Sequence, residues 1–345
     1  MLGKVAIEEA INPPSELHKQ AGMISRDIHP DHEDEYRKQV TSIEDRERRA
    51  AQTGVGYTIN SHVSPGIQAE RDPAIAEKLA TEVNDWMYSQ IKEKRSTQGA
   101  FAALSMHDPA NAAKELRRCV TQYGFHGALL NNWQLANNPD GSIKFLFYDQ
   151  PEYDIFWETL QELDVPLYLH PAPPAGPLHD IQYAQRPYLM GPPASFSNDV
   201  SLHLLGIVSN GIFDRYPKVQ VILGHLGERI VFDTWRINHW FEDVKKPRGL
   251  NKTCKKTIKQ YFRDNIWVST SGNFSTTALQ FVISIVGADR VLFAVDYPQE
   301  KYEDACGWFD NAEINLSDKV KIGRENAKKL FRLREYKDSE SVCEF

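Results

Sequence analysis

Eight short apolar runs, separated by amphipathic stretches, repeat along the 345-residue chain. Most of the runs are continuously apolar, which is typical of parallel strands buried on both faces. The stretches between them have helical spacing. This alternation predicts an α/β fold built as a closed (β/α)8 TIM barrel, with a doubly wound open sheet as the alternative. The predicted strands are Val5–Ile7, Tyr57–Asn60, Phe101–Leu104, Gly127–Leu130, Leu167–Leu169, Val219–Leu223, Ile266–Ser269 and Val291–Ala294.

The helical stretches have clear start and stop signals. Asp72-Pro73 and Asp108-Pro109 each place an N-cap residue before a proline at the first helical position. Gly124 is suited to end the second of these helices. No Gly-x-Gly-x-x-Gly follows the first strand, which weakens the open, dinucleotide-binding sheet as an alternative.

Two stretches interrupt the alternation without suggesting a second domain. Residues 12–41 are polar and follow the first strand, and residues 171–198 are rich in proline and glycine and follow the fifth. Barrel active sites are built from the loops after the strands. We therefore expect a single barrel domain over residues 1–345, with these two insertions serving as lids or substrate loops.

Charge and cysteine content narrow the partners and the compartment. A net charge of −7 argues against nucleic acid and anionic membranes as partners, because both require a positive field. None of the four cysteines forms a Cys-x-x-Cys pair, and the start of the chain has no apolar signal sequence. We expect a cytoplasmic enzyme that acts on a small molecule.

Ionisable side chains stand where four predicted strands end. Glu8 ends the first strand, His170 the fifth, His225 the sixth and Asp296 the eighth. The carboxyl ends of barrel strands converge, so two carboxylates and two imidazoles are expected to meet. Such a set suits one divalent cation and an acid–base group.

Each of these residues also has an ordinary structural explanation. Glu8 beside Glu9 fits a solvated pair, His170 before Pro171 fits a loop, and Asp296 fits a turn. The occurrence of all four residues at strand ends favours a metal or catalytic site, because burying four such groups without partners would be very unfavourable.

Five motifs spread over the chain carry a family resemblance. They are Gly3–Ala10, Phe213–Pro217, His225–Glu228, Asp296–Pro298 and Ile322–Ala327. Together they resemble the amidohydrolase superfamily, in the branch of aminocarboxymuconate-semialdehyde decarboxylase-like enzymes. Within that branch the chain resembles 2,3-dihydroxybenzoate and salicylate decarboxylases. The resemblance covers nearly the whole chain and is weakest from residue 12 to about residue 71.

The resemblance implies roles for the residues at the strand ends. Glu8, His170 and Asp296 would hold the metal, and His225 and Glu228 would form an acid–base or orienting pair. Glu228 lies three residues after His225, a spacing that on a helical turn brings the carboxylate to the imidazole and fixes its tautomer.

Two further residues are expected to contact the substrate. In the family an arginine at the place of Arg236 enters a neighbouring subunit's site and meets the substrate carboxylate; the alternative is an exposed helix arginine. We expect Tyr297, in the Asp-Tyr-Pro motif, to contact the substrate as well. The family forms dimers or tetramers, and Trp235, Trp240 and Phe241 fit either a homo-oligomer interface or local core packing.

One departure from the superfamily bears on the metal. Its commonest first-strand motif is His-x-His, whereas here Glu8 is followed two residues later by Ala10, as in the dihydroxybenzoate decarboxylases. The coordination sphere is therefore open and rich in carboxylate, so Mg²⁺ and Mn²⁺ are expected beside Zn²⁺. No organic cofactor is expected.

The predicted function is metal-dependent, non-oxidative decarboxylation of a hydroxylated benzoic acid, of the 2,3-dihydroxybenzoate or salicylate type. Asp296 or His225 would protonate the ring carbon, and carbon dioxide would leave. The alternative is a hydrolase of a lactone or amide on the same barrel, which Ala10 disfavours because hydrolytic members usually keep two histidines on the first strand. A non-catalytic binding scaffold is the third possibility, and failure to bind any divalent metal would favour it.

Overall fold

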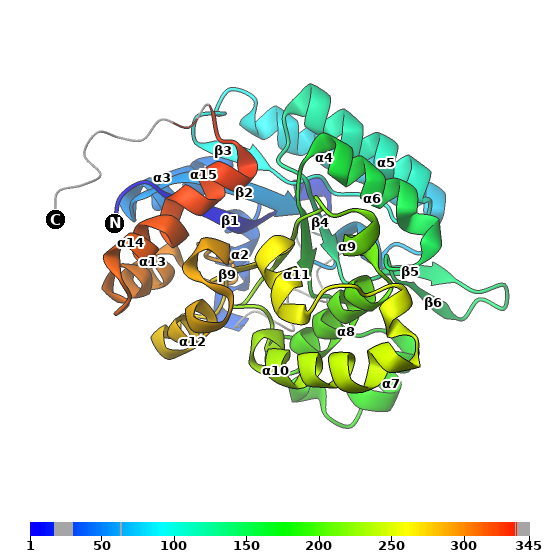
Figure 1. Ribbon diagram of the computed structural model, residues 1–345. Coiled ribbons are helices and arrows are strands. Elements are labelled where there is room, and N and C mark those ends of the chain that lie inside the picture. The colour runs from blue at the N-terminus through cyan, green and yellow to red at the C-terminus, as the bar shows by residue number, and fades with distance from the viewer. Residues whose placement is uncertain (17–29, 63, 335, 337–345) are drawn as a thin grey trace.

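A closed ring of eight parallel strands forms the centre of the molecule (Figure 1), as the computed structural model shows for residues 1–16, 30–62, 64–334 and 336. Residues 17–29 of the expected 12–41 insertion lie outside the described residues. The (β/α)8 prediction is confirmed. The barrel strands are β1 (Lys4–Ile11), β2 (Val55–His62), β3 (Gln98–Ala100), β4 (Ala128–Asn131), β7 (Leu167–His170), β8 (Val221–Leu223), β9 (Ile266–Ser269) and β10 (Val291–Leu292).

The ring closes through two narrow seams. Ladders join β1 to β2 to β3, and β4 to β7 to β8 to β9 to β10, all in parallel. Single parallel bridges link these two sheets, one between Ala102 and Ala128 and the other between Glu9 and Tyr297. The second seam sets β1 directly against the segment that follows β10, and this brings the first and the last strand ends together.

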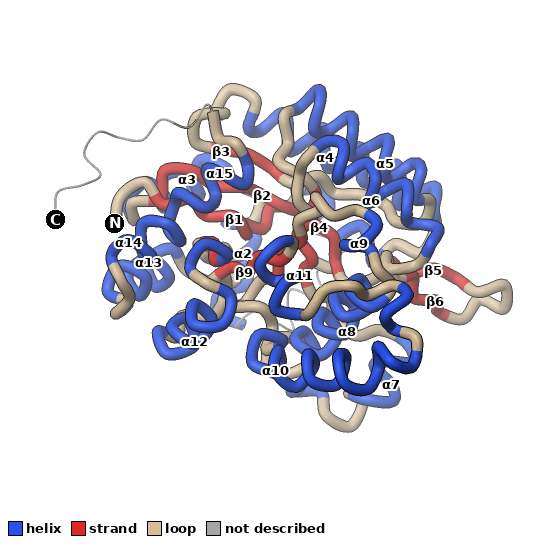
Figure 2. Tube along the Cα trace, viewed as in Figure 1, coloured by secondary structure: helices blue, strands red, loops and turns tan. Residues whose placement is uncertain are grey.

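Helices surround the barrel (Figure 2), and their predicted caps are present. Asp72 and Asp108 accept hydrogen bonds from the first backbone amides of their helices, and Gly124 adopts the left-handed conformation after the second. Within the described residues, every helix is too short or too polar to span a lipid bilayer. The helices are α2 (Glu33–Gln39), α3 (Ile43–Gln52), α4 (Pro73–Ile91), α5 (Pro109–Arg118), α6 (Asp154–Leu163), α7 (Gly176–Gln182), α8 (Ser195–Ser209), α9 (Ile212–Arg215), α10 (Ile230–Trp240), α11 (Ile258–Asp264), α12 (Thr276–Val286), α13 (Tyr302–Asn311), α14 (Leu316–Val320) and α15 (Asn326–Phe331).

Two buried apolar layers hold the barrel, one inside the ring and one between the ring and the helices. The inner layer alternates along the strands with the outer one, as strand geometry requires. At its lower end the inner layer includes Phe331, Leu333 and Tyr336 from the end of the described chain. Tyr336 donates a hydrogen bond to the carbonyl oxygen of Gly3, just before β1, so these residues close the amino-terminal end of the barrel.

The third strand lies three residues earlier than predicted. Residues Phe101–Leu104 are buried as expected, yet they form only one bridge to a neighbouring strand. Side-chain amides replace the missing partner strand: Asn84 bonds both the N–H and the carbonyl of Ala103, and Gln68 donates to the carbonyl of Leu104. The apolar run Phe101–Leu104 therefore predicted burial correctly, but it did not predict where the strand pairs with its neighbours.

Regular structure also appears where none was predicted. The antiparallel hairpin of β5 (Gln134–Asn137) and β6 (Ile143–Leu146) projects from the side of the barrel (Figure 1). Its turn contains Pro139-Asp140-Gly141, a recognisable turn signal. The predicted insertion at residues 171–198 contains α7 and the start of α8.

Gly127 should be far less replaceable than Gly249. Both have positive φ angles, +128° and +119°, but a Cβ on Gly127 would lie 2.1 Å from the Pro166 carbonyl oxygen, whereas nothing lies within 4 Å at Gly249. Gly249→Ala should lower the free energy of unfolding by about 1–2 kcal/mol, because alanine is strained in this backbone conformation. Gly127→Ala should cost a further ~1–3 kcal/mol because the strand must shift. Urea unfolding of the two variants measures the difference, and equal losses would contradict this account.

Candidate metal centre

The four side chains predicted at the strand ends meet at one place. One ligand atom each from Glu8, His170, His225 and Asp296 lies within 4.8 Å of all the others. Glu8 comes from β1 and His170 ends β7, while His225 and Asp296 follow β8 and β10. The set therefore occupies the carboxyl-terminal mouth of the barrel, as predicted.

His170 presents a defined ring nitrogen to this cluster. Its Nδ1 lies 2.8 Å from the Pro171 carbonyl oxygen and 3.2 Å from Asn131 Oδ1. Only a protonated Nδ1 can donate to the carbonyl, so Nε2 carries the lone pair. That nitrogen lies 3.3 Å from Glu8 Oε1. Two electron-rich atoms at this separation favour a cation between or beside them.

His225 and Glu228 pair through an unusual turn. His225 Nδ1 lies 2.5 Å from Glu228 Oε1, and its Nε2 lies 3.6 Å from Glu8 Oε1 and 3.5 Å from Asp296 Oδ2. The predicted pairing is therefore present, but not on an ordinary helical turn. All five residues from His225 to Arg229 have positive φ angles, between 50° and 81°. Left-handed backbone costs roughly 1–2 kcal/mol per non-glycine residue, and such conformations cluster at functional sites.

Buried charges at the cluster interact strongly. Burial disfavours charge on Glu8, but the positive charge of His225, together with smaller contributions from neighbouring groups, outweighs this effect and lowers the pKa of that carboxyl. Burial raises the pKa of Asp296; the hydrogen bond with His225 opposes this shift, and the charge of Glu8 adds to it. Burial also opposes charge on His225, yet Glu228 and then Glu8 raise the pKa of the imidazole well above its usual value.

These residues fit a divalent cation. Glu8 Oε1 is buried and has no hydrogen-bond partner within the described part of the chain, although it faces two imidazole nitrogens. A buried oxygen of this kind needs a positive charge beside it. Protonation of His225 is one source, and a metal ion that displaces this proton is the other. Two carboxylates and two imidazoles suit Mn²⁺ and neighbouring divalent ions.

Tyr297 lies apart from the four clustered side chains, in the layer between the ring and the helices. Its ring packs 4.8 Å from that of Tyr302 and lies under the Arg46 guanidinium, also at 4.8 Å. Its hydroxyl is 3.4 Å from Asp45 of α3. The side chain following Asp296 points to the helix side of the barrel wall, because neighbouring positions along an extended strand end face opposite ways. Contact between Tyr297 and the substrate stays a prediction.

Glu9 occupies the same outer layer as Tyr297. It is fully buried, accepts a 2.7 Å hydrogen bond from the Tyr302 hydroxyl, and lies 3.7 Å from Arg46. Burial raises the pKa of Glu9 to about 8 despite the arginine. The register of β1 against β2 shifts between Ala6 and Glu9, and this bulge turns Glu8 inward and Glu9 outward.

Arg236 also lies apart from the cluster of its own chain. It stands on α10 with its side chain exposed, and it has no ion-pair partner among the described residues. Within one chain, Arg236 therefore fits the second alternative, an exposed arginine on a helix. This geometry leaves open the role in a neighbouring subunit that the resemblance implies.

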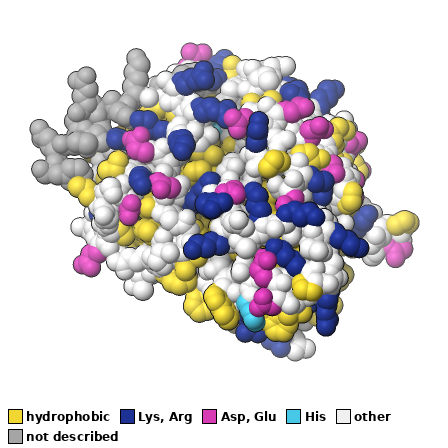
Figure 3. Space-filling model, in the orientation of Figure 1, with side chains coloured by type: hydrophobic (Ala, Val, Ile, Leu, Met, Phe, Trp, Pro, Cys, Tyr) yellow, Lys and Arg dark blue, Asp and Glu magenta, His cyan; other side chains and the backbone are white. Residues whose placement is uncertain are grey.

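An exposed aromatic surface surrounds Arg236. Phe232 and Trp235 are each 76% exposed and Trp240 is 47% exposed, whereas Phe241 is half-buried against the core. Phe281 of α12 stands 5.9 Å from Phe232, ring to ring. Hydrophobic side chains gather at this lower edge of the molecule (Figure 3), where Figure 1 places α10 and α12.

Sequence reasoning missed the hydroxyl groups around Glu8. Tyr168 of β7 donates a hydrogen bond to Glu8 Oε2, and Ser269 and Ser271 lie beside it. A usable signal existed, since Tyr168 precedes His170 by two residues and so faces the same side of the strand.

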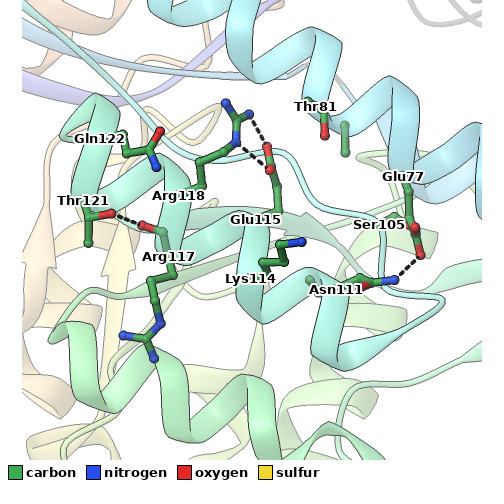
Figure 4. A pocket seen from close by; sticks show the side chains of 12 residues that line it. Glu77, Thr81, Ser105, Asn111, Lys114, Glu115, Arg117, Arg118, Thr121 and Gln122 are labelled. Carbon is green, nitrogen blue, oxygen red and sulfur yellow. Dashed lines mark hydrogen bonds and ion pairs between the residues drawn. The ribbon is translucent and has the colours of Figure 1, made fainter.

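Two surface cavities lie away from the cluster. A cavity of about 430 Å³ lies between α4 and α5, lined by charged and polar side chains including Glu77, Lys114 and Arg118 (Figure 4). A second, of about 740 Å³, lies beside α8 and includes Leu202 and Phe241. None of the four clustered residues lines either cavity.

Comparison with known proteins gives a consistent result. Residues 27–333 match a family model described as amidohydrolase. The chain is 38% identical over 337 residues to gamma-resorcylate decarboxylase from Polaromonas sp. strain JS666, covering 96% of this chain and 99% of that protein.

Solved structures agree in fold. A 2,6-dihydroxybenzoate decarboxylase crystallised with 2,6-dihydroxybenzoate superposes with a TM-score of 0.89 at 38% identity, over 96% of this chain and all of that one (100%). The Polaromonas sp. JS666 dihydroxybenzoic acid decarboxylase, crystallised with manganese and 2-nitroresorcinol, also gives 0.89 at 38% identity, over 96% and 98%.

The expected closeness to 2,3-dihydroxybenzoate decarboxylase needs correction. The enzyme of that name from Aspergillus niger is 24% identical over 310 residues and covers 62% of this chain. Gamma-resorcylate is 2,6-dihydroxybenzoate, so the more similar proteins are named for an acid with a hydroxyl on each side of its carboxylate.

Divalent metal should stabilise the fold through Glu8. With Mn²⁺ at about 100 times its dissociation constant, the free energy of unfolding should increase by about 2.7 kcal/mol. The melting temperature should rise accordingly, and a chelator should reverse the rise. The gain should increase with pH, because metal binding displaces the proton that His225 binds unusually strongly. Glu8→Gln should remove the shift, while Glu313→Gln, on an exposed side chain, should keep it. An unchanged shift in Glu8→Gln would exclude this site.

Proposed function

The chain belongs to the amidohydrolase family, and we propose that it is a carboxy-lyase that removes carbon dioxide from 2,6-dihydroxybenzoate without a redox cofactor. The observation that supports this most is the convergence of Glu8, His170, His225 and Asp296 in a chain that is 38% identical, almost from end to end, to a gamma-resorcylate decarboxylase.

The substrate itself explains why no organic cofactor is needed. Both hydroxyls of 2,6-dihydroxybenzoate are ortho to the carbon that carries the carboxylate, and both donate electron density to it. Protonation of this carbon interrupts the aromatic ring. Cleavage of the carbon–carbon bond then returns its electron pair to the ring and releases carbon dioxide. The reaction consumes one proton and produces resorcinol.

Glu8, His170 and Asp296 would hold a divalent cation, with His225 facing the same point. The cation would supply positive charge for the substrate's carboxylate and phenolic oxygens and for the charge that develops on them. Manganese is favoured because a similar structure contains it.

Asp296 is the proposed proton donor to the ring carbon. A carboxyl group can act as the general acid that this proton transfer requires. His225 Nε2 lies 3.5 Å from Asp296 Oδ2, so the imidazole can return the proton between turnovers. Glu228 holds the opposite side of this ring and keeps its orientation.

Residues 171–198 are proposed as a substrate loop of the single barrel domain. The loop directly follows His170, and both of its ends are tied to the barrel mouth. Ser64 donates to the Pro171 carbonyl at 3.1 Å, and Arg229 donates to the Pro193 carbonyl at 2.8 Å.

Carbon dioxide release tests the substrate. The kcat/KM for 2,6-dihydroxybenzoate should exceed those for 2,3-dihydroxybenzoate and salicylate by at least about tenfold, the equivalent of about 1.4 kcal/mol in transition-state binding. Product formation is followed by chromatography of resorcinol, with a lactone as the hydrolase control. Faster turnover of either rival acid, or of the lactone, would contradict the proposal.

The same assay tests the proton donor. Asp296→Asn keeps the shape of the side chain but cannot donate an acidic proton, so kcat should fall about 10²- to 10⁴-fold with circular dichroism unchanged. Asp289→Asn, on an exposed carboxylate paired with Lys321, serves as the matched control. Wild-type turnover by Asp296→Asn would refute this role.

We further propose a homodimer in which Arg236 acts on the partner's substrate. The exposed aromatic surface around Arg236 has the composition of an oligomer interface. A guanidinium binds a carboxylate through two parallel hydrogen bonds, so it would suit the substrate carboxylate. The absence of an ion-pair partner for Arg236 among the described residues of its own chain leaves the side chain available.

Subunit mixing tests this arrangement. Arg236→Met should raise KM strongly, and co-expression with Asp296→Asn should restore activity, because one site of the mixed dimer combines an intact Asp296 with an intact Arg236 from the partner. Arg263→Met, on an exposed arginine of α11, should leave KM unchanged. If Arg236→Met is fully active, or if mixing restores nothing, Arg236 does not act across subunits.

A further inference from the structure

Two buried hydroxyl groups contact one oxygen of Glu8, and a third hydroxyl contacts one of these two. The Tyr168 hydroxyl donates to Glu8 Oε2 and is 2.7 Å from Ser269 Oγ. Ser269 Oγ is 3.4 Å from the same carboxylate oxygen and 3.1 Å from Ser271 Oγ. All three residues have no exposed surface, so no solvent competes for these contacts.

The two oxygens of Glu8 therefore have different surroundings. Oε2 accepts the hydroxyl hydrogen bonds. Oε1 has no hydrogen-bond partner in the described part of the chain and faces His170 and His225 at 3.3 and 3.6 Å. A partial rotation of the carboxylate would move Oε2 away from the hydroxyls of Tyr168 and Ser269. The hydroxyl cluster thus opposes that rotation.

The backbone beside the cluster leaves it just enough room. A Cβ at Gly224, directly after β8, would lie 3.0 Å from Glu8 Oε2, 3.0 Å from Ser271 Oγ and 3.1 Å from the Tyr168 hydroxyl. Glycine here does not serve a positive φ angle, since Gly224 does not have one. Its lack of a side chain lets β7 and β9 bring their hydroxyl groups to one carboxylate oxygen of Glu8.

We propose that Tyr168, Ser269 and Ser271 are positioning residues that hold Glu8 so that it presents Oε1 alone to the divalent cation. The inference rests on the proposed metal-dependent function and deepens it. A carboxylate that gives one oxygen rather than two leaves a coordination position free. Substrate with two adjacent oxygens, a carboxylate and an ortho hydroxyl, needs such free positions.

Metal affinity tests the proposal independently of turnover. Apo-protein is titrated with Mn²⁺, and free Mn²⁺ is measured by electron paramagnetic resonance. Tyr168→Phe removes one hydroxyl and should weaken Mn²⁺ binding about 10- to 100-fold, the usual range for a partner of a metal ligand. The spectrum of the bound ion should also change, because Glu8 is free to turn. Ser269→Ala should weaken binding in the same direction.

Tyr153→Phe is the matched control. Tyr153 is equally buried, and its hydroxyl donates to the Met106 carbonyl oxygen at 2.9 Å, away from the cluster. This variant should lose stability, as any buried hydroxyl deletion does, but it should keep wild-type Mn²⁺ affinity and the wild-type spectrum. If Tyr168→Phe does not fold, the Mn²⁺ affinity and spectrum of Ser269→Ala, which is a smaller change, test the proposal instead.

Wild-type affinity and spectrum in both Tyr168→Phe and Ser269→Ala would overturn the proposal, as would a wild-type protein that binds no Mn²⁺. Failure of the proposed reaction gives a different pattern. In that case the wild-type protein binds Mn²⁺ and the variants bind it more weakly, yet none releases carbon dioxide from 2,6-dihydroxybenzoate.

Discussion

The seam between β1 and the segment after β10 is the constraint on which the site depends. The Asp296 N–H donates to the Glu8 carbonyl at 3.0 Å, and the Ala10 N–H donates to the Tyr297 carbonyl at 2.7 Å. Closing the ring thereby places two acidic side chains from opposite ends of the chain beside each other. On the outside, Arg46 bonds the Ala10 carbonyl and neighbours Glu9, so the seam is held from both faces.

Carboxylates that are brought together and buried need compensating positive charge. Glu8 and Asp296 share His225 between them, and Glu228 adds a third negative group on the far side of that ring. The excess of negative charge makes the mouth of the barrel a cation site, and the proposed anionic substrate in turn needs that cation. The acidic character of the barrel mouth is therefore compatible with an anionic aromatic substrate only through the metal.

Sequence patterns predicted the barrel and the four clustered residues because both follow from strand ends. Apolar runs located the strands, and Asp-Pro pairs located helix starts. The features that the patterns missed concern the direction of side chains and the pairing of strands. The bulge in β1 turns Glu8 inward and Glu9 outward, and no spacing reveals this. The Tyr168 contact with Glu8 depends on the three-dimensional register of distant strands. Amide side chains such as Asn84, which replace a partner strand, are equally invisible in a linear pattern.

The left-handed run from His225 to Arg229 has a consequence for how such a protein diversifies. Glycine at any of its four non-glycine positions would relieve the backbone, yet it would also add freedom to the segment that aims the imidazole and its carboxylate. Selection for thermal stability would therefore favour glycine in this segment, whereas selection for catalysis would favour the present residues. New specificities are more readily acquired elsewhere around the barrel mouth, in loops whose backbone has ordinary conformations and whose replacement leaves the aim of His225 untouched.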